Sequence, residues 1–304
     1  MTDKLGGPAG SGSFQDLSDR RKALKALVAE GNAALLPGAA NALTARIIED
    51  LGFRAAYLTG AGLTNTHLGM PDLGIVTASD VVETTSRISD VCQLPLIVDM
   101  DTGFGNALNT YTTVQRLERA GAAGIQLEDQ VFPKKCGHFS GKDVVPLDEM
   151  LGKLKACLDA RRDSDTQIIA RTDSRAVLGF DAAIERAHAM IEVGADIIFV
   201  EAPETLEEIR AIGQLPAPQL INLVVGGRTP MAGLDDLKEA GFSLVLYANA
   251  ALQASVKAMQ EVLGSLKEHG SLQEVSDRLA EFTERQRIVG KPAFDALSDR
   301  YEGA

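Results

Sequence analysis

The acidic residues of this chain gather at the ends of apolar segments, where their spacing suits metal and proton chemistry. One apolar run ends in Asp99-Met-Asp101, and a second ends in Glu128-Asp129. Carboxylate oxygens are the ligands that hard cations such as Mg²⁺ prefer. A structural alternative is that Asp99 and Asp101 cap the next helix and pair with Arg or Lys. The second acidic strand end favours a metal, because neighbouring carboxylates repel one another unless a positive charge lies between them.

A cysteine follows the second acidic pair, inside the basic stretch Lys134-Lys-Cys-Gly-His138. By default a cysteine is a small buried hydrophobe. This stretch is too polar for a core position, and its cationic side chains favour the thiolate and so set the proton affinity of the thiol. We therefore expect Cys136 to take part in chemistry, with His138 beside it.

Further polar residues stand at the ends of other apolar runs. Arg171 is a planar donor suited to a bidentate contact with a substrate carboxylate, or alternatively to a structural salt bridge with a neighbouring acid. For Asp129, Asp173 and Glu201, a direct role in the site and a supporting hydrogen bond both stay open.

A recurring sequence phrase indicates how these residues are positioned. A small-residue helix end with Gly is followed by a continuous apolar run, as at Gly52, Gly121, Gly194 and Gly241. Glycine ends helices in the left-handed conformation, so each phrase predicts a helix stop and a strand start. Continuous rather than alternating apolar runs indicate strands that are covered on both faces.

Eight strands are expected, separated by stretches with apolar residues at helical spacing, such as residues 110–120 and 182–193. They begin near Ala34, Ala55, Leu96, Ile125, Ile168, Ile197, Leu220 and Leu244. Eight strand–helix units predict an α/β protein with a (β/α)8 TIM barrel, in which catalytic groups lie at the carboxyl ends of the strands. A doubly wound open sheet is the alternative, but no Gly-x-Gly-x-x-Gly follows the first strand.

The chain divides into three expected parts. Residues 1–15 form a flexible N-terminal arm, residues 16–252 the catalytic barrel and residues 253–304 a helical extension. The extension is expected to be helical from Gln253 to about Gln286 with a break at Gly270, and a further short helix is expected after Pro292. Surplus helices on a barrel often pack on a neighbouring subunit, so we expect a homo-oligomer.

Composition limits the partners and the compartment. The 304 residues are 45% hydrophobic and 24% charged, as in soluble globular proteins. A net charge of −12 repels phosphate backbones and disfavours nucleic acid. No apolar run is long enough to span a membrane, and the N-terminus lacks the apolar core of a signal peptide. The three cysteines are widely spaced and form no Cys-x-x-Cys pair, which indicates a reducing cytoplasm.

Together these segments resemble the isocitrate lyase/phosphoenolpyruvate mutase superfamily over nearly the whole chain. The matching segments are residues 57–62, 71–74, 99–105, 128–130, 134–138 and 169–173. The resemblance implies an α/β barrel with a C-terminal helix exchanged between subunits, a tetramer built as a dimer of dimers, and Mg²⁺ as cofactor, with Mn²⁺ as a substitute. The loop with Cys136 resembles that of the carbon–carbon lyases, most closely the branch of 2,3-dimethylmalate lyase, 2-alkylmalate lyase and oxaloacetate acetylhydrolase, with methylisocitrate lyase a near relative.

The implied reaction cleaves a 2-hydroxy dicarboxylate of the 2-alkylmalate type, such as 2,3-dimethylmalate or 2-methylisocitrate. The products would be a 2-oxo acid such as pyruvate and a carboxylic acid. By resemblance, Asp99, Asp101 and Glu128 would hold the metal, partly through water, and Cys136 would protonate the enolate that leaves.

The resemblance also implies contacts with the substrate. Arg171 would bind the carboxylate that becomes part of the 2-oxo acid, together with the backbone at Thr59, Gly60 and Ala61. Either Tyr57 or Asp72 would take the hydroxyl proton, and the sequence does not choose between them. The remaining contacts are expected from Gly137, His138, Glu201, Asn222 and Arg228.

One departure concerns residues 222–230, where Val224 and Val225 replace the polar residues of relatives. The distal substrate carboxylate is therefore expected to be bound differently, with Arg228 helping. Other reactions stay open: an oxaloacetate acetylhydrolase or decarboxylase, or a phosphonate-processing mutase or hydrolase. A barrel that binds a metabolite without catalysis is the alternative from a different class.

Overall fold

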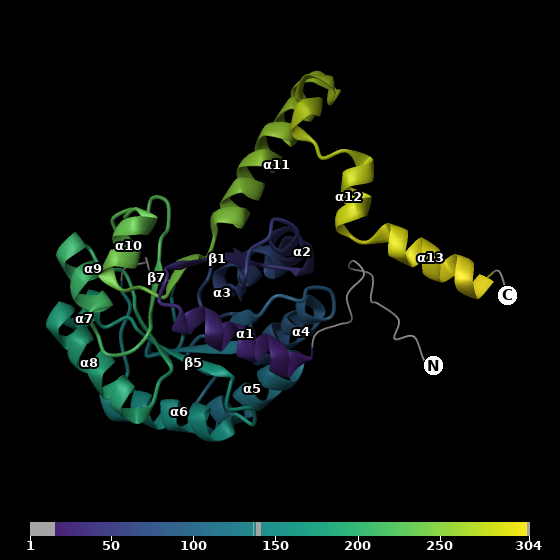
Figure 1. Cartoon of the computed structure of the whole chain (residues 1–304). Coiled ribbons are helices and arrows are strands. Elements are labelled where there is room, and N and C mark those ends of the chain that lie inside the picture. Colours follow the sequence, from purple (N-terminus) through teal and green to yellow (C-terminus); the bar gives the residue numbers. More distant parts are fainter. Residues whose placement is uncertain (1–15, 136, 138–140, 303–304) are drawn as a thin grey trace.

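The computed structural model describes residues 16–135, 137 and 141–302, and its core is a closed barrel of parallel strands (Figure 1). Each strand pairs with the next, and β8 pairs with β1. The prediction of a TIM barrel is confirmed, and the open-sheet alternative is wrong. Every strand begins at the expected residue or next to it: β1 (Ala34–Ala39), β2 (Ala56–Leu58), β3 (Leu96–Asp99), β4 (Gly124–Glu128), β5 (Gln167–Thr172), β6 (Ile197–Val200), β7 (Gln219–Asn222) and β8 (Leu244–Tyr247).

The strands are continuous apolar runs because side chains on both of their faces are buried. Ile97 of β3 points into the barrel, where it joins a cluster with Phe199 and Leu246, while Val98 packs outward against the helices. The helices that cover the barrel are α2 (Ala42–Asp50), α4 (Ala78–Ser89), α5 (Ala107–Ala120), α6 (Leu147–Ala160), α8 (Phe180–Val193), α9 (Leu206–Gly213) and α10 (Leu234–Ala240). Three short helical segments lie in connections: α3 (Gly60–Leu63), the π-helix η1 (Thr64–Leu68) and α7 (Arg175–Leu178).

The recurring glycines end helices as the sequence predicts. Gly121 follows α5 with φ 109°, and Gly194 follows α8 with φ 113°. A side chain at either position would strain the backbone, so glycine lets each helix stop and turn directly into β4 or β6.

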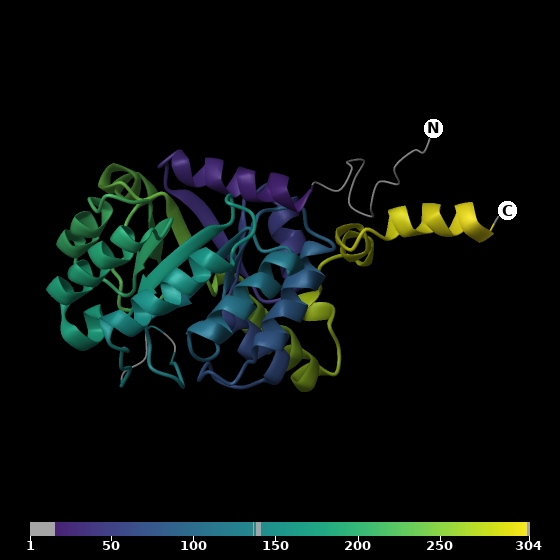
Figure 2. The same ribbon diagram turned by 90° about the horizontal axis from the view of Figure 1, so that it is seen from below.

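The helix α1 (Leu17–Ala29) closes the end of the barrel where the strands begin (Figures 1 and 2). Its Leu24, Leu27 and Val28 belong to the same buried cluster as the side chains inside the barrel. Space for Leu24 depends on Gly124, since a Cβ there would lie 3.0 Å from the Leu24 Cδ2. Arg20 fixes the helix further by donating hydrogen bonds to the Ser89 and Cys92 carbonyls.

The C-terminal helices leave the barrel instead of covering it (Figure 1). They are α11 (Ala250–His269), the 3-10 helix η2 (Gln273–Arg278), α12 (Phe282–Ile288) and α13 (Lys291–Glu302). The helix α11 begins slightly before the expected Gln253 and ends at Gly270, where the break was predicted. No described side chain of α11, α12 or α13 is buried, and Leu263 and Phe282 are 60% and 67% exposed.

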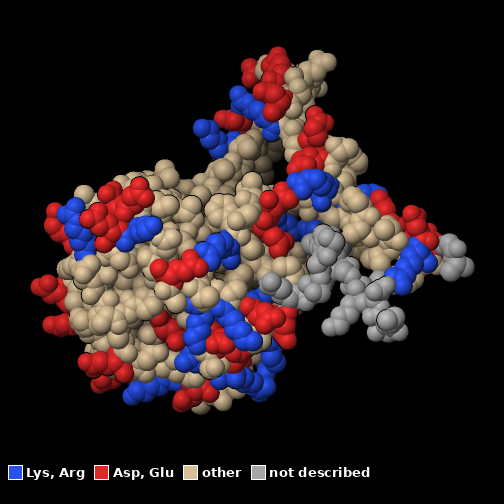
Figure 3. Space-filling view, in the orientation of Figure 1, with Lys and Arg blue, Asp and Glu red and all other residues tan. Residues whose placement is uncertain are grey.

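Two surface properties bear on possible partners. No helix in residues 16–302, with the gaps named above, has the length and apolar content needed to cross a membrane. On the face drawn in Figure 3, acidic and basic side chains lie interspersed in small groups.

We expect Leu24→Ala to lower the free energy of unfolding by about 2–5 kcal/mol, because it opens a cavity between α1 and the barrel interior. Lys22→Ala is the control on the same helix, since Lys22 is exposed and forms only an exposed ion pair with Asp19. Urea denaturation of both variants measures the difference. A Leu24→Ala variant as stable as the wild type would show that α1 does not contribute to the core.

Candidate active site

Charged and polar side chains line a small cavity at the carboxyl ends of the strands. Asp99 ends β3, Glu128 ends β4 and Asn222 ends β7. In the barrel register Glu128 lies beside Arg171 of β5. The cavity is lined by Tyr57, Thr59, Ala61, Asp72, Asp99, Lys134, Gly137, Arg171, Phe199, Glu201, Asn222, Val224, Leu246, Ala248 and Asn249. The structure thus brings most of the predicted site residues together.

The three predicted metal ligands are buried at adjacent strand ends. Asp99 accepts hydrogen bonds from the Asp101 backbone N–H (3.1 Å) and from the Gln126 side chain (3.2 Å). Burial raises the pKa of Asp101 to about 6, with Asp99 adding to the rise and Lys134 opposing it. Burial also raises the pKa of Glu128 well above its ordinary value, against the influence of Arg171. Burial therefore disfavours the charged forms of Asp101 and Glu128 despite the cations beside them.

Lys134 is the principal cation beside these acids. Its ammonium lies 2.6 Å from Asp72 Oδ1 and 2.8 Å from Asp101 Oδ1, and its side chain is 4% exposed. Burial alone would lower the pKa of Lys134, but Asp101, Glu128 and the other carboxylates raise it well above the ordinary value. This role of Lys134 is not predicted by its sequence context, which marks it only as a charge that flanks Cys136 at the start of the basic stretch.

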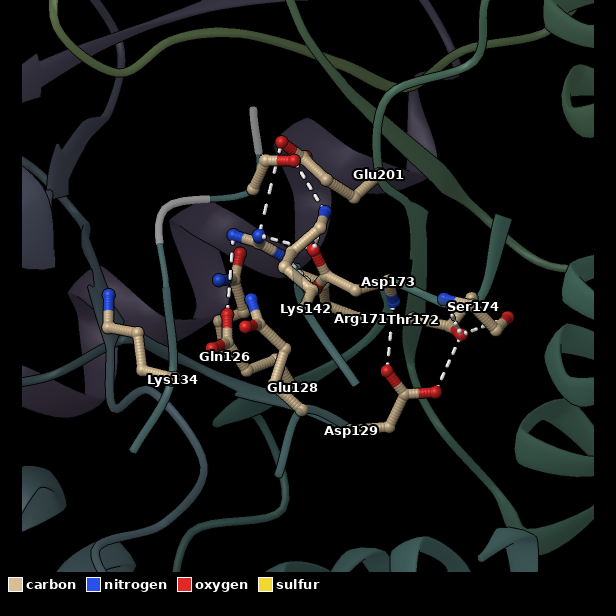
Figure 4. A network of polar contacts seen from close by, with 12 residues as sticks. Gln126, Glu128, Asp129, Lys134, Lys142, Arg171, Thr172, Asp173, Ser174 and Glu201 are labelled. Carbon is tan, nitrogen blue, oxygen red and sulfur yellow. Dashed lines mark hydrogen bonds and ion pairs between the residues drawn. The ribbon is translucent and has the colours of Figure 1, made fainter. Parts of the chain in front are cut away.

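Arg171 lies at the centre of a second group of charges (Figure 4). Its Nε and Nη2 donate to the two oxygens of Asp173 at 2.9 and 3.1 Å, and its Nη1 lies 3.4 Å from Glu128 Oε2. The guanidinium also stacks over Phe199, with 5.2 Å from its central carbon to the ring centre. Arg171 therefore forms the structural salt bridge and also lines the cavity, so the two interpretations of this residue are compatible.

Asp173 is held by a second cation, Lys142, whose Nζ lies 2.7 Å from its Oδ1 and also donates to the Gly137 carbonyl. Burial alone would raise the pKa of Asp173, but Arg171 and Lys142 bring it down to about 2. Gly137 approaches the site so closely that a Cβ there would lie 2.2 Å from Glu201 Oε1 and 2.5 Å from Arg171 Nη2. Its neighbours Cys136 and His138 lie outside the described residues.

The two candidates for the hydroxyl proton differ in their surroundings. Tyr57 is buried, and burial together with Asp99 raises the pKa of its phenol well above the ordinary value. The phenol therefore keeps its proton at neutral pH and does not act as a base there. Asp72 lines the same cavity as a carboxylate paired with Lys134.

Backbone from the β2–α4 connection forms another wall. Thr59 caps α3 by accepting a hydrogen bond from the Gly62 N–H, and its hydroxyl donates to Asn249 Oδ1 at 3.3 Å. A Cβ at Gly60 would lie 3.0 Å from Asp101 Oδ1, so the glycine lets this backbone approach the acids. Asn249 was not predicted to lie at the site, because its place after β8 is its only sequence signal.

The β7–α10 connection contributes differently from what the sequence suggested. Val224 lines the cavity beside Asn222, whereas Val225 is 67% exposed. Arg228 is not among the lining residues, and its Nη1 lies 3.8 Å from Glu204 Oε1. The structure therefore brings Val224, but not Arg228, to the cavity.

The donor set fits a hydrated magnesium ion. Among the residues that the structure describes, no group of three or more His, Cys, Asp or Glu is close enough to hold an ion directly. Glu128 Oε1 is nevertheless buried without a hydrogen-bond donor. Mg²⁺ keeps several of its waters and takes only one or two carboxylates from a protein, which matches such an arrangement.

The chain matches the model of a known protein family. The family model of phosphoenolpyruvate phosphomutase matches residues 24–267, which span the barrel and most of α11. The chain belongs to the phosphoenolpyruvate mutase/isocitrate lyase superfamily. The resemblance inferred from the sequence is thereby confirmed.

Two curated relatives within the superfamily are lyases. The chain is 42% identical to 2,3-dimethylmalate lyase of Eubacterium barkeri over 279 residues, covering 91% of this chain and 96% of the relative. It is 44% identical to 2-methylisocitrate lyase of Aeropyrum pernix over 268 residues, covering 88% and 86%. Both alignments cover nearly the whole length of each protein.

Solved structures of the superfamily share the fold. Oxaloacetate acetylhydrolase in complex with 3,3-difluorooxalacetate superposes with a TM-score of 0.88 at 34% identity, covering 94% of this chain and 98% of that one. Phosphonopyruvate hydrolase in complex with oxalate and Mg²⁺ superposes with a TM-score of 0.84 at 32% identity, covering 93% and 99%.

The low pKa of Asp173 predicts how stability changes in acid. A carboxylate whose pKa is lowered by folding contributes fully above its unfolded pKa, and the contribution is lost as the pH falls toward 2. Asp173→Asn should lower the free energy of unfolding by about 3–5 kcal/mol near neutral pH, because two buried cations lose their partner. The difference from the wild type should shrink as the pH falls through the range from about 4 to 2.

Denaturation curves across this pH range measure the effect. Asp295→Asn is the control, since Asp295 forms only an exposed ion pair with Lys291. A difference for Asp173→Asn that stays constant down to the lowest pH would contradict the charge assignment.

Proposed function

We propose that this protein is a Mg²⁺-dependent carbon–carbon lyase acting on a 2-hydroxy dicarboxylate of the 2-alkylmalate type. The products are a 2-oxo acid such as pyruvate and a carboxylic acid. The observation that carries the proposal is the 42% identity to 2,3-dimethylmalate lyase across 96% of that enzyme. The buried acids and cations at the strand ends supply the groups that such a cleavage needs.

The magnesium site is assigned to Asp99, Asp101 and Glu128, which would hold the ion partly through water. Support comes from the buried Glu128 Oε1, which accepts no hydrogen bond from the described residues, and from the superfamily structure that contains Mg²⁺. When bound, Mg²⁺ lowers the pKa of a substrate hydroxyl and stabilises developing negative charge. Mn²⁺ is the expected substitute.

The protein side chains orient the substrate and move its proton. Arg171 binds the carboxylate that stays with the 2-oxo acid, and the backbone at Thr59, Gly60 and Ala61 holds its other side. The hydroxyl proton passes to Asp72, because the Tyr57 phenol already holds its own proton. Lys134, beside Asp72 and Asp101, stabilises negative charge in a site that excludes water.

Cys136 donates the proton that completes the leaving fragment, with His138 next to it. The placement of Gly137 supports this role, since this residue lines the cavity in contact with Arg171 and Glu201. A thiol at the neighbouring position in the sequence would act there as a general acid. Glu201, which follows β6, and Asn222 of β7 also contact the substrate.

Hydrolysis of oxaloacetate is the second candidate, favoured by the superposition on oxaloacetate acetylhydrolase. It would use the same acids and release oxalate and acetate instead of a 2-oxo acid. The match to the phosphoenolpyruvate phosphomutase family model keeps phosphonate chemistry as a further possibility.

The assembly and the compartment belong to the same proposal. The α11 helix exposes Met259 and Leu263 although it follows the last barrel strand, which supports packing on a second copy of this chain. We propose a homotetramer with exchanged C-terminal helices. The buried free thiols of Cys92 and Cys157 support a reducing cytoplasm.

The substrate is tested by NMR analysis of products from 2,3-dimethylmalate, 2-methylisocitrate, citramalate, oxaloacetate and phosphonopyruvate. We expect cleavage of a 2-alkylmalate to pyruvate and an acid. EDTA should abolish turnover, and Mg²⁺ should restore it, because the metal stabilises the developing charge. Turnover that survives EDTA would remove the metal from the proposal, and release of oxalate and acetate would favour the hydrolase.

Cys136→Ser should lower kcat for the preferred 2-alkylmalate by about 100-fold or more, because a serine hydroxyl is a much weaker acid than a thiol. Binding of oxalate and Mg²⁺, measured by calorimetry, should be unchanged. Cys157→Ala is the control, since Cys157 is a buried thiol on α6 away from the cavity. Undiminished turnover by Cys136→Ser would exclude the thiol as the proton donor.

A further inference from the structure

Asp129 follows the candidate metal ligand Glu128 directly, yet its side chain has a separate environment. Its carboxylate is fully buried and does not line the cavity. Oδ1 accepts a hydrogen bond from the Asp173 backbone N–H at 2.8 Å, and Oδ2 accepts from the Thr172 hydroxyl at 2.6 Å (Figure 4). Oδ2 also accepts from Arg186 Nη1 of α8 at 3.0 Å. One carboxylate thus joins the ends of β4 and β5 to a covering helix.

The β5 residues that Asp129 holds are those that position Arg171. Asp173, whose backbone is fixed by Asp129, presents its carboxylate to both Nε and Nη2 of Arg171. Lys142 binds the same carboxylate of Asp173. The direction of the Arg171 guanidinium therefore depends, through Asp173, on a residue that cannot touch the substrate.

Asp129 also contributes to hydrogen bonds that hold the end of the connection between β4 and α6. Its backbone carbonyl accepts a hydrogen bond from the Val145 N–H at 2.9 Å, and Arg186 Nη2 donates to the Val145 carbonyl at 2.9 Å. This connection supplies Lys134 and Lys142 to the site. The Asp129–Arg186 pair is thus linked to three of the cations around the cavity.

Both side-chain oxygens of residue 129 must accept hydrogen bonds to satisfy the donors around them. An asparagine at position 129 would replace one acceptor by an N–H donor, which would face either the Asp173 N–H or the donors on Thr172 and Arg186. A buried donor left without an acceptor is destabilising, so the strand ends would shift to relieve it. The buried Arg186 would also lose its counter-charge.

We propose that Asp129, together with Arg186, is a positioning residue that fixes the Arg171 guanidinium through Asp173. Its effect on turnover rests on the proposed lyase function, whereas its effect on the geometry of Arg171 does not. In this role Asp129 lies outside the cavity and exchanges no proton with the substrate.

Glu118 offers a matched control, because it contacts the chain near the amino end of β5, whereas Asp129 contacts the carboxyl end of the same strand. It lies on α5 and is 4% exposed. Its carboxylate accepts from the backbone N–H groups of Arg162 and Asp163 and from the Thr166 hydroxyl, just before β5 begins. Glu118→Gln disturbs a comparable buried carboxylate without touching the carboxyl ends of the strands.

The test compares Asp129→Asn and Glu118→Gln in the full-length protein. Both should lower the melting temperature. Asp129→Asn should in addition lower kcat/KM for the preferred 2-alkylmalate by about 100-fold, since a small misplacement of a binding group has effects of this size. It should weaken the binding of oxalate with Mg²⁺ by about 10-fold, because a two-point contact with Arg171 is lost. Glu118→Gln should keep both values within about twofold of the wild type.

Crystal structures of the two variants supply a readout that needs no activity. The proposal expects the two hydrogen bonds from Arg171 to Asp173 to be broken or rearranged in Asp129→Asn and to be retained in Glu118→Gln. It is overturned if Arg171 keeps both bonds in Asp129→Asn, or if Glu118→Gln loses as much affinity for oxalate as Asp129→Asn does. If the wild type cleaves no substrate, the proposed function fails, but the crystal structures still decide the positioning role.

Discussion

Among the described residues, six buried carboxylates and three buried cationic side chains lie around the cavity at the carboxyl end of this barrel, and their ion pairs connect the strand ends to the loops. Two of the cations come from the β4–α6 connection and the third from β5. Lys134 and Arg171 each lie between two or more carboxylates, whereas Lys142 pairs with Asp173 and also donates to the Gly137 carbonyl. The residues are Asp72, Asp99, Asp101, Glu128, Asp173 and Glu201, with Lys134, Lys142 and Arg171.

The charges form two groups that meet at Glu128. On one side Lys134 joins Asp72 and Asp101, and on the other Arg171 and Lys142 hold Asp173. Arg171 and Lys134 both lower the pKa of Glu128, yet burial still keeps this pKa well above its ordinary value. Burial thus disfavours the charged forms of Asp101 and Glu128 after β3 and at the end of β4, where an added cation would stabilise them.

The architecture could be predicted from the sequence because its signals are local and periodic. Continuous apolar runs and helix-ending glycines located every strand to within a residue, and the acids after those runs had to meet where parallel strands end. The roles of Lys134, Lys142 and Asn249 were not predicted, because long side chains on irregular connections follow no period. The substrate contact expected from Arg228 stays a prediction, and its Nη1 lies 3.8 Å from Glu204 Oε1. The resemblance to the superfamily supplied roles that spacing alone left open.

The helix α1 has a consequence for how the molecule is assembled. It comes before every strand in the chain, yet Leu24, Leu27 and Val28 pack against side chains from strands as late as β8. The barrel interior that these side chains cover is complete only when β8 has paired with β1. During synthesis on the ribosome this helix would leave the exit tunnel early and have to wait, exposed, for the rest of the barrel. The first helix made is thus expected to be among the last to dock.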